Sequence, residues 1–79
     1  MKIEDIKAMN LENGHLVEIR YPNEHRNPET RCGWFQRLYP TEPQFVEIAH
    51  RLERNHCPRD VVQYKLEQIY WLIRLESTF

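Results

Sequence analysis

The run of residues 15–22, HLVEIRYP, constrains the fold of this chain more than any other stretch. It alternates apolar Val17, Ile19 and Tyr21 with charged side chains. Successive side chains of a strand point to opposite faces, so this alternation is typical of a strand with one buried face. Pro22 lacks an N–H for a strand ladder and ends the run. The chain is therefore expected to build a sheet and to cover one face of it.

A second run, residues 32–40 (CGWFQRLYP), is rich in aromatic side chains and also ends at a proline. The segment between the two runs, residues 23–31 (NEHRNPETR), is polar and shows no apolar period. We therefore predict an antiparallel hairpin whose two strands are joined by a long polar loop. Loops longer than a tight turn requires are frequent binding sites. At the N-terminus, the apolar spacing over residues 2–9 predicts one short helical turn.

From Thr41 onward the apolar spacing changes to three and four residues. Thr41 followed by Gln44 is a capping-box pattern, and Pro58 with Asp60 suits the start of another helix. The pattern predicts helices over 45–55 and 58–75, with the stretch ERNHCPRD (53–60) as the joint between them. The two apolar stripes are Phe45, Ile48, Ala49 and Leu52, and then Val62, Leu66, Ile69 and Ile73.

The preferred fold class is α+β: one domain over residues 1–79, in which an antiparallel hairpin or small sheet packs with two C-terminal helices. The alternative reads FVEI, DVVQYKL and YWLIRL as three further strands and gives a small five-stranded β-barrel. That pattern is similar to SH3-like and Sm-like domains, without a residue motif specific to either. Helices are preferred because the caps agree with the apolar period.

The charges of the chain nearly cancel, with 11 Lys and Arg against 12 Asp and Glu in 79 residues. Non-specific nucleic-acid binders usually show a basic excess, because phosphate contacts supply their affinity. No apolar run approaches the ~20 residues of a membrane span, and the start MKIEDIKAMN lacks the apolar region of a signal peptide. We therefore expect a cytoplasmic protein without a membrane partner, its two cysteines reduced.

The residue types that bind zinc are present, but their spacing does not suit a zinc site. Structural zinc ligands usually come in close pairs such as C-x2-C, which this chain lacks. Cys57 precedes a predicted helix, whose N-terminus would stabilise a thiolate. A pocket, an orienting group and an oxyanion site are not evident, so we expect no enzyme, no catalytic residue and no cofactor or metal. The weighed zinc ligands are His25, Cys32, His50, His56 and Cys57.

Nucleic acid is the alternative partner, through arginine and aromatic side chains of the first hairpin. Such side chains on a sheet can hold phosphates and stack bases. The hairpin must also cover the predicted helices, and its aromatic side chains are the ones available for that task. The residues concerned are Arg20, Arg26, Arg31 and Arg37, interleaved with Tyr21, Trp34, Phe35 and Tyr39.

A protein partner is the preferred expectation, because the C-terminal run QIYWLIRLESTF carries more large apolar groups than one helix face can bury. Tyr, Trp and Arg are enriched at interface hot spots. The predicted function is a small non-enzymatic regulator or inhibitor that occupies the surface of a protein partner, which includes a second copy of this chain. In size alone it is similar to phage-encoded inhibitors of bacterial defence systems, including anti-CRISPR proteins. The predicted partner-binding residues are His25, Arg26, Arg31, Tyr70, Trp71 and Arg74, with Phe79 adding to the apolar end.

Overall fold

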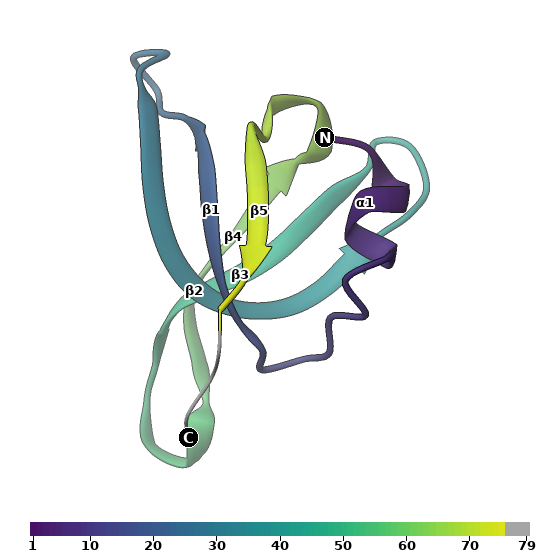
Figure 1. The fold of residues 1–79 in the computed structure, drawn as a ribbon. Helices are drawn as coiled ribbons and strands as arrows, with labels where there is room; N and C mark the ends of the chain where they lie inside the picture. Colours follow the sequence, from purple (N-terminus) through teal and green to yellow (C-terminus); the bar gives the residue numbers. More distant parts are fainter. Residues whose placement is uncertain (76–79) are drawn as a thin grey trace.

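The computed structural model describes residues 1–75, which form a five-stranded antiparallel sheet preceded by one short helix (Figure 1). Two 3-10 turns interrupt the second half of the chain. None of the helices within residues 1–75 is long or apolar enough to cross a membrane. The elements are α1 (Ile3–Lys7), β1 (Leu16–Pro22), β2 (Pro28–Tyr39), β3 (Phe45–Leu52), η1 (Arg54–His56), β4 (Pro58–Lys65), η2 (Leu66–Gln68) and β5 (Trp71–Arg74).

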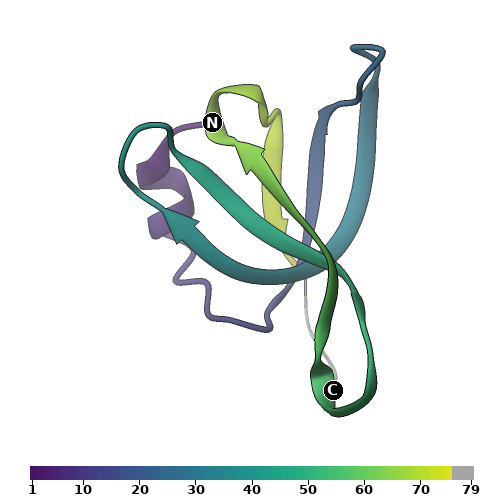
Figure 2. The ribbon, with the colours of Figure 1, turned by 180° about the vertical axis from the view of Figure 1, so that it is seen from behind.

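The strands follow the order β4-β3-β2-β1-β5, and β2 links the two halves of the sheet. β2 is 12 residues long and pairs with β1 through its first half and with β3 through its second half. Its register with β3 shifts between Phe35 and Arg37, and such irregularities bend a strand. As a result β1 and β5 lie at the front in Figure 1, whereas β3 and β4 lie at the front in Figure 2, seen from behind.

The core lies inside the curve of the sheet. Alternate residues of the strands point inward, including Val17 and Ile19 of β1 and Ile48 of β3, all with 0% of their surface exposed. Leu72 of β5, which pairs with Ile19, adds to the same layer. Helix α1 contributes Ile6, which is 1% exposed, and Ile3 packs against the core beside it, so these two side chains hold the helix on the sheet.

Gly33 allows β2 and β3 to approach closely on the inward face. A Cβ atom there would lie 2.5 Å from Cγ2 of Ile48 and 2.7 Å from the carbonyl oxygen of Ala49. Both distances are far below van der Waals contact, so this crossing of the two strands requires a residue without a side chain.

The prediction of two C-terminal helices is wrong, because residues 45–74 form β3, β4, β5 and the two short turns. Val46 and Tyr64 lie off the predicted helical stripes, yet both are buried, while Ile73 lies on a stripe and is 44% exposed. Apolar residues occupy both faces of these strands, so their combined spacing imitates a helical period. The strands fall on the segments of the alternative, five-stranded prediction. Within residues 1–75, β4 and β5 share no ladder, and the sheet stays open between them.

The predicted hairpin is present, but its second strand is longer than expected. β2 begins at Pro28, which pairs with Pro22, so the connecting turn covers residues 23–27 instead of 23–31. The stretch ERNHCPRD holds the turn between β3 and β4 and the first three residues of β4, and is not a joint between helices. There Asn55 takes a left-handed φ of 61°, a conformation that asparagine tolerates better than most residues. In place of the predicted helix cap, the Gln44 amide donates to the carbonyl of Pro40 at 3.0 Å.

Candidate functional site

The predicted loop residues His25 and Arg26 lie in the turn between β1 and β2, and both are exposed. The turn is ordered by Asn23, whose side-chain oxygen accepts from the N–H of His25 at 2.9 Å and from the N–H of Asn27 at 3.0 Å. The imidazole of His25 lies 3.5 Å from the carboxylate of Glu24. These bonds fix the turn, which presents an arginine and a histidine to solvent.

Arg31 is not part of this turn, because it lies within β2 on the inward face, opposite Ile19. Its guanidinium is 3.3 Å from the carboxylate of Asp60 on β4. Around it lies a group of side chains from four strands, at the point where the β1–β2 and β3–β4 hairpins diverge. We call this group the inner polar cluster: Tyr21, Arg31, His50, Asp60 and Tyr64.

The hydrogen bonds of His50 determine which of its ring nitrogens carries a hydrogen. Its Nδ1 lies 2.8 Å from the carbonyl oxygen of Cys32, which can only accept, so Nδ1 carries a hydrogen. Burial lowers the pKa of His50, and the Cys32 carbonyl opposes this only in part. His50 is therefore neutral at pH 7, and Nε2 accepts the hydroxyl hydrogen of Tyr64. Burial also raises the pKa of Tyr64, which keeps this hydroxyl protonated and able to donate.

Tyr21 joins the cluster to the first hairpin. Its ring centroid lies 4.7 Å from that of Tyr64, and its hydroxyl donates to the Glu29 carboxylate at 2.7 Å. Burial and this carboxylate raise the pKa of Tyr21. Burial acts against the charge of Arg31, but contacts with Tyr21, Tyr64 and Asp60 outweigh it and raise the pKa of Arg31. In residues 1–75 no buried side-chain nitrogen or oxygen lacks a partner, so we interpret the cluster as a clamp between the hairpins.

Trp71 shares the outward side of β5 with an apolar residue that the sequence placed in the core, and Tyr70 directly precedes Trp71 in the chain. Trp71 lies opposite Arg20 on the outward side of β1 and β5, and Ile73 lies opposite Glu18 on the same side. Tyr70, immediately before β5, is 55% exposed, and Ile73 is 44% exposed. We call Leu16, Tyr70, Trp71 and Ile73 the β5 patch.

The other predicted partner-binding residues are arranged differently around this patch. Arg74 is exposed but lies opposite Val17, on the inward side of the sheet and outside the patch. The turn with His25 and Arg26 lies at the Tyr70 end of β1, since the N–H of Tyr70 donates to the carbonyl of Arg20. Phe79 lies outside the described residues.

The side chains weighed as zinc ligands are spread over separate strands and turns. In the described part of the chain, no group of three or more His, Cys, Asp and Glu side chains could hold a metal ion. Cys32 is exposed and Cys57 half-buried, and both are free thiols. Cys57 precedes strand β4 and not a helix, so the expected stabilisation of its thiolate by a helix N-terminus has no basis.

The first hairpin does not form the single arginine and aromatic face that the sequence suggested. Tyr21, Arg31 and Phe35 point inward, whereas Trp34 and Arg37 point outward. The outward residues of β2 continue across β3 and β4, and we call this surface the outer β2–β3–β4 face. Its members are Trp34, Arg37, Tyr39, Phe45, Glu47, Ala49, Arg51, Arg59, Val61, Gln63 and Lys65.

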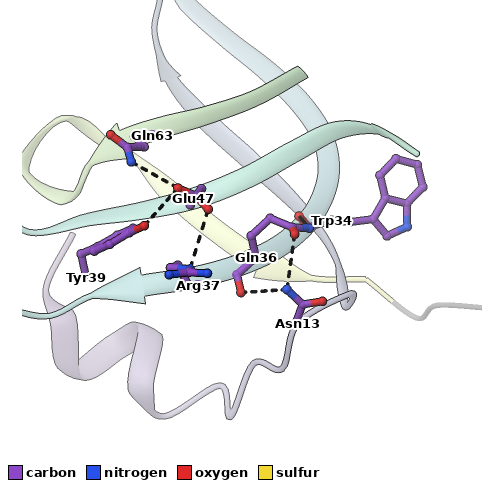
Figure 3. A network of polar contacts seen from close by, with 7 residues as sticks. All are labelled: Asn13, Trp34, Gln36, Arg37, Tyr39, Glu47 and Gln63. Atoms are coloured by element: carbon purple, nitrogen blue, oxygen red, sulfur yellow. Dashed lines mark hydrogen bonds and ion pairs between the residues drawn. The ribbon is translucent and has the colours of Figure 1, made fainter. Parts of the chain in front are cut away.

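Glu47 organises the middle of the outer β2–β3–β4 face (Figure 3). Its carboxylate accepts from the hydroxyl of Tyr39 and from the amide of Gln63, each at 3.2 Å, and it lies 3.9 Å from the guanidinium of Arg37. Its side chain is only 18% exposed, so these three groups largely enclose the charge. The face is therefore held in a fixed arrangement.

Comparison with known protein families, curated proteins and solved structures finds no match for this chain.

Proposed function

We propose that this chain is a non-enzymatic, cytoplasmic protein-binding regulator or inhibitor that docks its partner on the β5 patch. The observation that carries the proposal is the exposure of Ile73 (44%) beside Trp71 on the outward side of β5, with Tyr70 (55% exposed) immediately before the strand. Three large apolar groups within four residues, all at least partly exposed, are more apolar surface than a small protein usually leaves uncovered without a function. The free state of both cysteines is consistent with a reducing compartment.

The residue types around the patch support a specific interface. Tyrosine, tryptophan and arginine dominate interface hot spots, and Trp71 lies opposite Arg20 with Tyr70 next to it in the chain. Complete burial of a side chain such as Ile73 is worth about 1.5–3 kcal/mol, so covering its exposed half contributes on the order of 1 kcal/mol. Arg20 and Glu18 supply opposite charges next to the apolar groups, and these charges favour one orientation of the partner.

The test compares two variants at equally exposed positions on the two edge strands of the sheet. Ile73→Lys places a charge in the β5 patch beside Glu18, whereas Val61→Lys changes a residue of β4 that is also 44% exposed. The immobilised wild-type chain and the Val61→Lys variant should retain the same protein from the native host, identified by mass spectrometry. The Ile73→Lys variant should lose it.

The same pair of variants covers the case in which the partner is a second copy. Light scattering would then report a dimer for wild type and Val61→Lys and a monomer for Ile73→Lys. Retention of every wild-type partner by a folded Ile73→Lys variant would exclude the β5 patch as the docking surface.

A further inference from the structure

We propose that the outer β2–β3–β4 face binds single-stranded nucleic acid. This inference does not use Tyr70, Trp71 or Ile73. Trp34 pairs with Leu16 of the β5 patch, but most of the face lies on β3 and β4, behind β1 and β5 (Figures 1 and 2). With no α-helices for them to cover in residues 45–75, the outward aromatic side chains of β2 and β3 are half-buried and keep part of their surface exposed to solvent. The chain therefore has a sheet face with rings and cations that the core does not use.

The charge of this face differs from that of the whole chain. It carries four basic side chains and one acidic side chain, with a second carboxylate, Glu53, at its edge, whereas the chain as a whole has 11 basic and 12 acidic residues. Glu47 is largely enclosed by its partners, and Glu53 contacts Arg51 and Arg59. A basic face on a slightly acidic molecule favours a polyanion at this surface and repels it elsewhere. The basic residues are Arg37, Arg51, Arg59 and Lys65.

Aromatic rings lie among these cations at both ends of the face. Tyr39 and Phe45 meet edge to face with centroids 5.0 Å apart, and the Arg37 guanidinium lies 5.8 Å from the centroid of the Tyr39 ring. Trp34, five positions before Tyr39 along β2, projects its indole away from the strand (Figure 3). At ~3.3 Å per residue these two ring sites are about 16 Å apart, so an extended chain of a few nucleotides can reach both.

Arg51 and Arg59 form the phosphate-binding end of the face. They lie directly opposite each other on β3 and β4, and both bind Glu53, at 3.1 Å and 3.3 Å. One carboxylate thus holds two guanidinium groups next to each other on an exposed edge. A phosphate also carries negative charge and oxygen acceptors. It can therefore bind the two guanidinium groups together with the Glu53 carboxylate or in its place.

Single strands fit this face better than duplexes, because stacking on Trp34 requires bases that are not enclosed in a helix. Non-sequence-specific binders of single strands combine aromatic platforms with basic side chains in the same way. We therefore expect binding that tolerates sequence and depends strongly on salt. With the four basic side chains in contact with phosphates, the logarithm of affinity should fall with the logarithm of salt with a slope of about −3.

The experiment measures fluorescence anisotropy of a labelled single-stranded thymidine oligonucleotide of about twelve nucleotides at low salt. Trp34→Ala should raise Kd about tenfold, the loss expected for one stacked base. Trp71→Ala is the matched control, because it removes the chain's other tryptophan from β5, outside the outer β2–β3–β4 face, and should leave Kd unchanged. Circular dichroism confirms that each variant is folded.

Arg51→Gln and Glu53→Gln test the site without changing an apolar side chain, and Arg74→Gln is their control. Arg51→Gln should raise Kd severalfold and reduce the salt slope, while Arg74→Gln, exposed on the inward side of β5, should do neither. Glu53→Gln removes the carboxylate that occupies Arg51 and Arg59, so it should lower Kd and steepen the salt dependence.

The absence of binding at low salt would overturn the proposal. So would an equal loss in Trp34→Ala and Trp71→Ala, which would place the oligonucleotide elsewhere, or a Kd unchanged by Glu53→Gln. Polyglutamate that competes as well as an unlabelled oligonucleotide would identify the face as a site for acidic proteins instead. None of these outcomes concerns Ile73, so the proposed protein-binding function is tested separately.

Discussion

Gly33→Ala tests whether the close approach of β2 and β3 determines the stability of this fold. The new Cβ would lie 2.5 Å from Cγ2 of Ile48, 2.7 Å from the Ala49 carbonyl oxygen and 3.0 Å from Nδ1 of His50. Non-bonded carbon atoms prefer separations of ~3.5–4.0 Å, so the first two contacts require relief of about 1 Å. The Ile48 side chain can turn aside, but the carbonyl belongs to the backbone of β3 and cannot.

Relief therefore requires β3 to move away from β2, which stretches their ladder and the hydrogen bond between His50 and Cys32. Overpacking costs ~1–3 kcal/mol, and a contact with backbone should place Gly33→Ala near the upper end, at about 3 kcal/mol. For a domain of this size that corresponds to a fall in Tm of about 12–24 °C.

Urea unfolding followed by far-UV circular dichroism measures the effect directly. The midpoint should fall with an unchanged m-value, since the extent of the folded surface stays the same. Cys32→Ala, one residue away but exposed and outward, is the matched control and should change the free energy of unfolding by less than ~0.5 kcal/mol. A similarly small change for Gly33→Ala would refute the reasoning, because it would show that the strands separate without cost.

Three further predictions concern the core and the inner polar cluster. Ile6→Ala removes the one buried side chain of α1 and should lower the free energy of unfolding by about 2–4 kcal/mol in urea, whereas exposed Ala8→Ser should change it little. Tyr64→Phe leaves Nε2 of His50 without its donor and should cost about 1–2 kcal/mol in the same assay; an unchanged midpoint would mean that the bond contributes nothing. Because burial lowers the pKa of His50 in the folded state, the unfolded chain binds the proton more readily, so stability should fall as pH decreases below ~6.5. His50→Asn should reduce this pH dependence, and an equal slope in both proteins would contradict it.

The elements that sequence reasoning identified are those specified by local pattern. Residues 17–21 alternate strictly, and β1 occupies Leu16–Pro22; the apolar spacing at residues 2–9 corresponds to α1. The start of β2 was missed because Pro28, Glu29 and Thr30 extend beyond the core into solvent. A strand segment that does not pack against the core shows no alternation of apolar residues. It can be recognised only from its pairing with the neighbouring strand.

The second half of the chain was misread because its structure depends on distant partners. Phe45 and Ala49 point outward while Ile48 points inward, and together they satisfy a helical template. The pairing of β3 with β2 decides between a helix and a strand for this segment. The spacing of apolar residues along the sequence carries no information about that pairing. The inner polar cluster was missed for the same reason, since His50 and Tyr64 become neighbours only once the register of β3 and β4 is known.

The pairing of β5 with β1 has a consequence for how the chain folds as it is synthesised. β1 is complete once Pro22 has been added, but Leu72, which pairs with Ile19, follows about fifty residues later. Until then the nascent chain exposes the apolar side of its first hairpin and an unpaired strand edge, the features that promote aggregation of incomplete folds. Pairing over such a separation is also slow. The yield of folded protein in cells should therefore depend on translation speed and chaperone supply, even if the finished domain is stable.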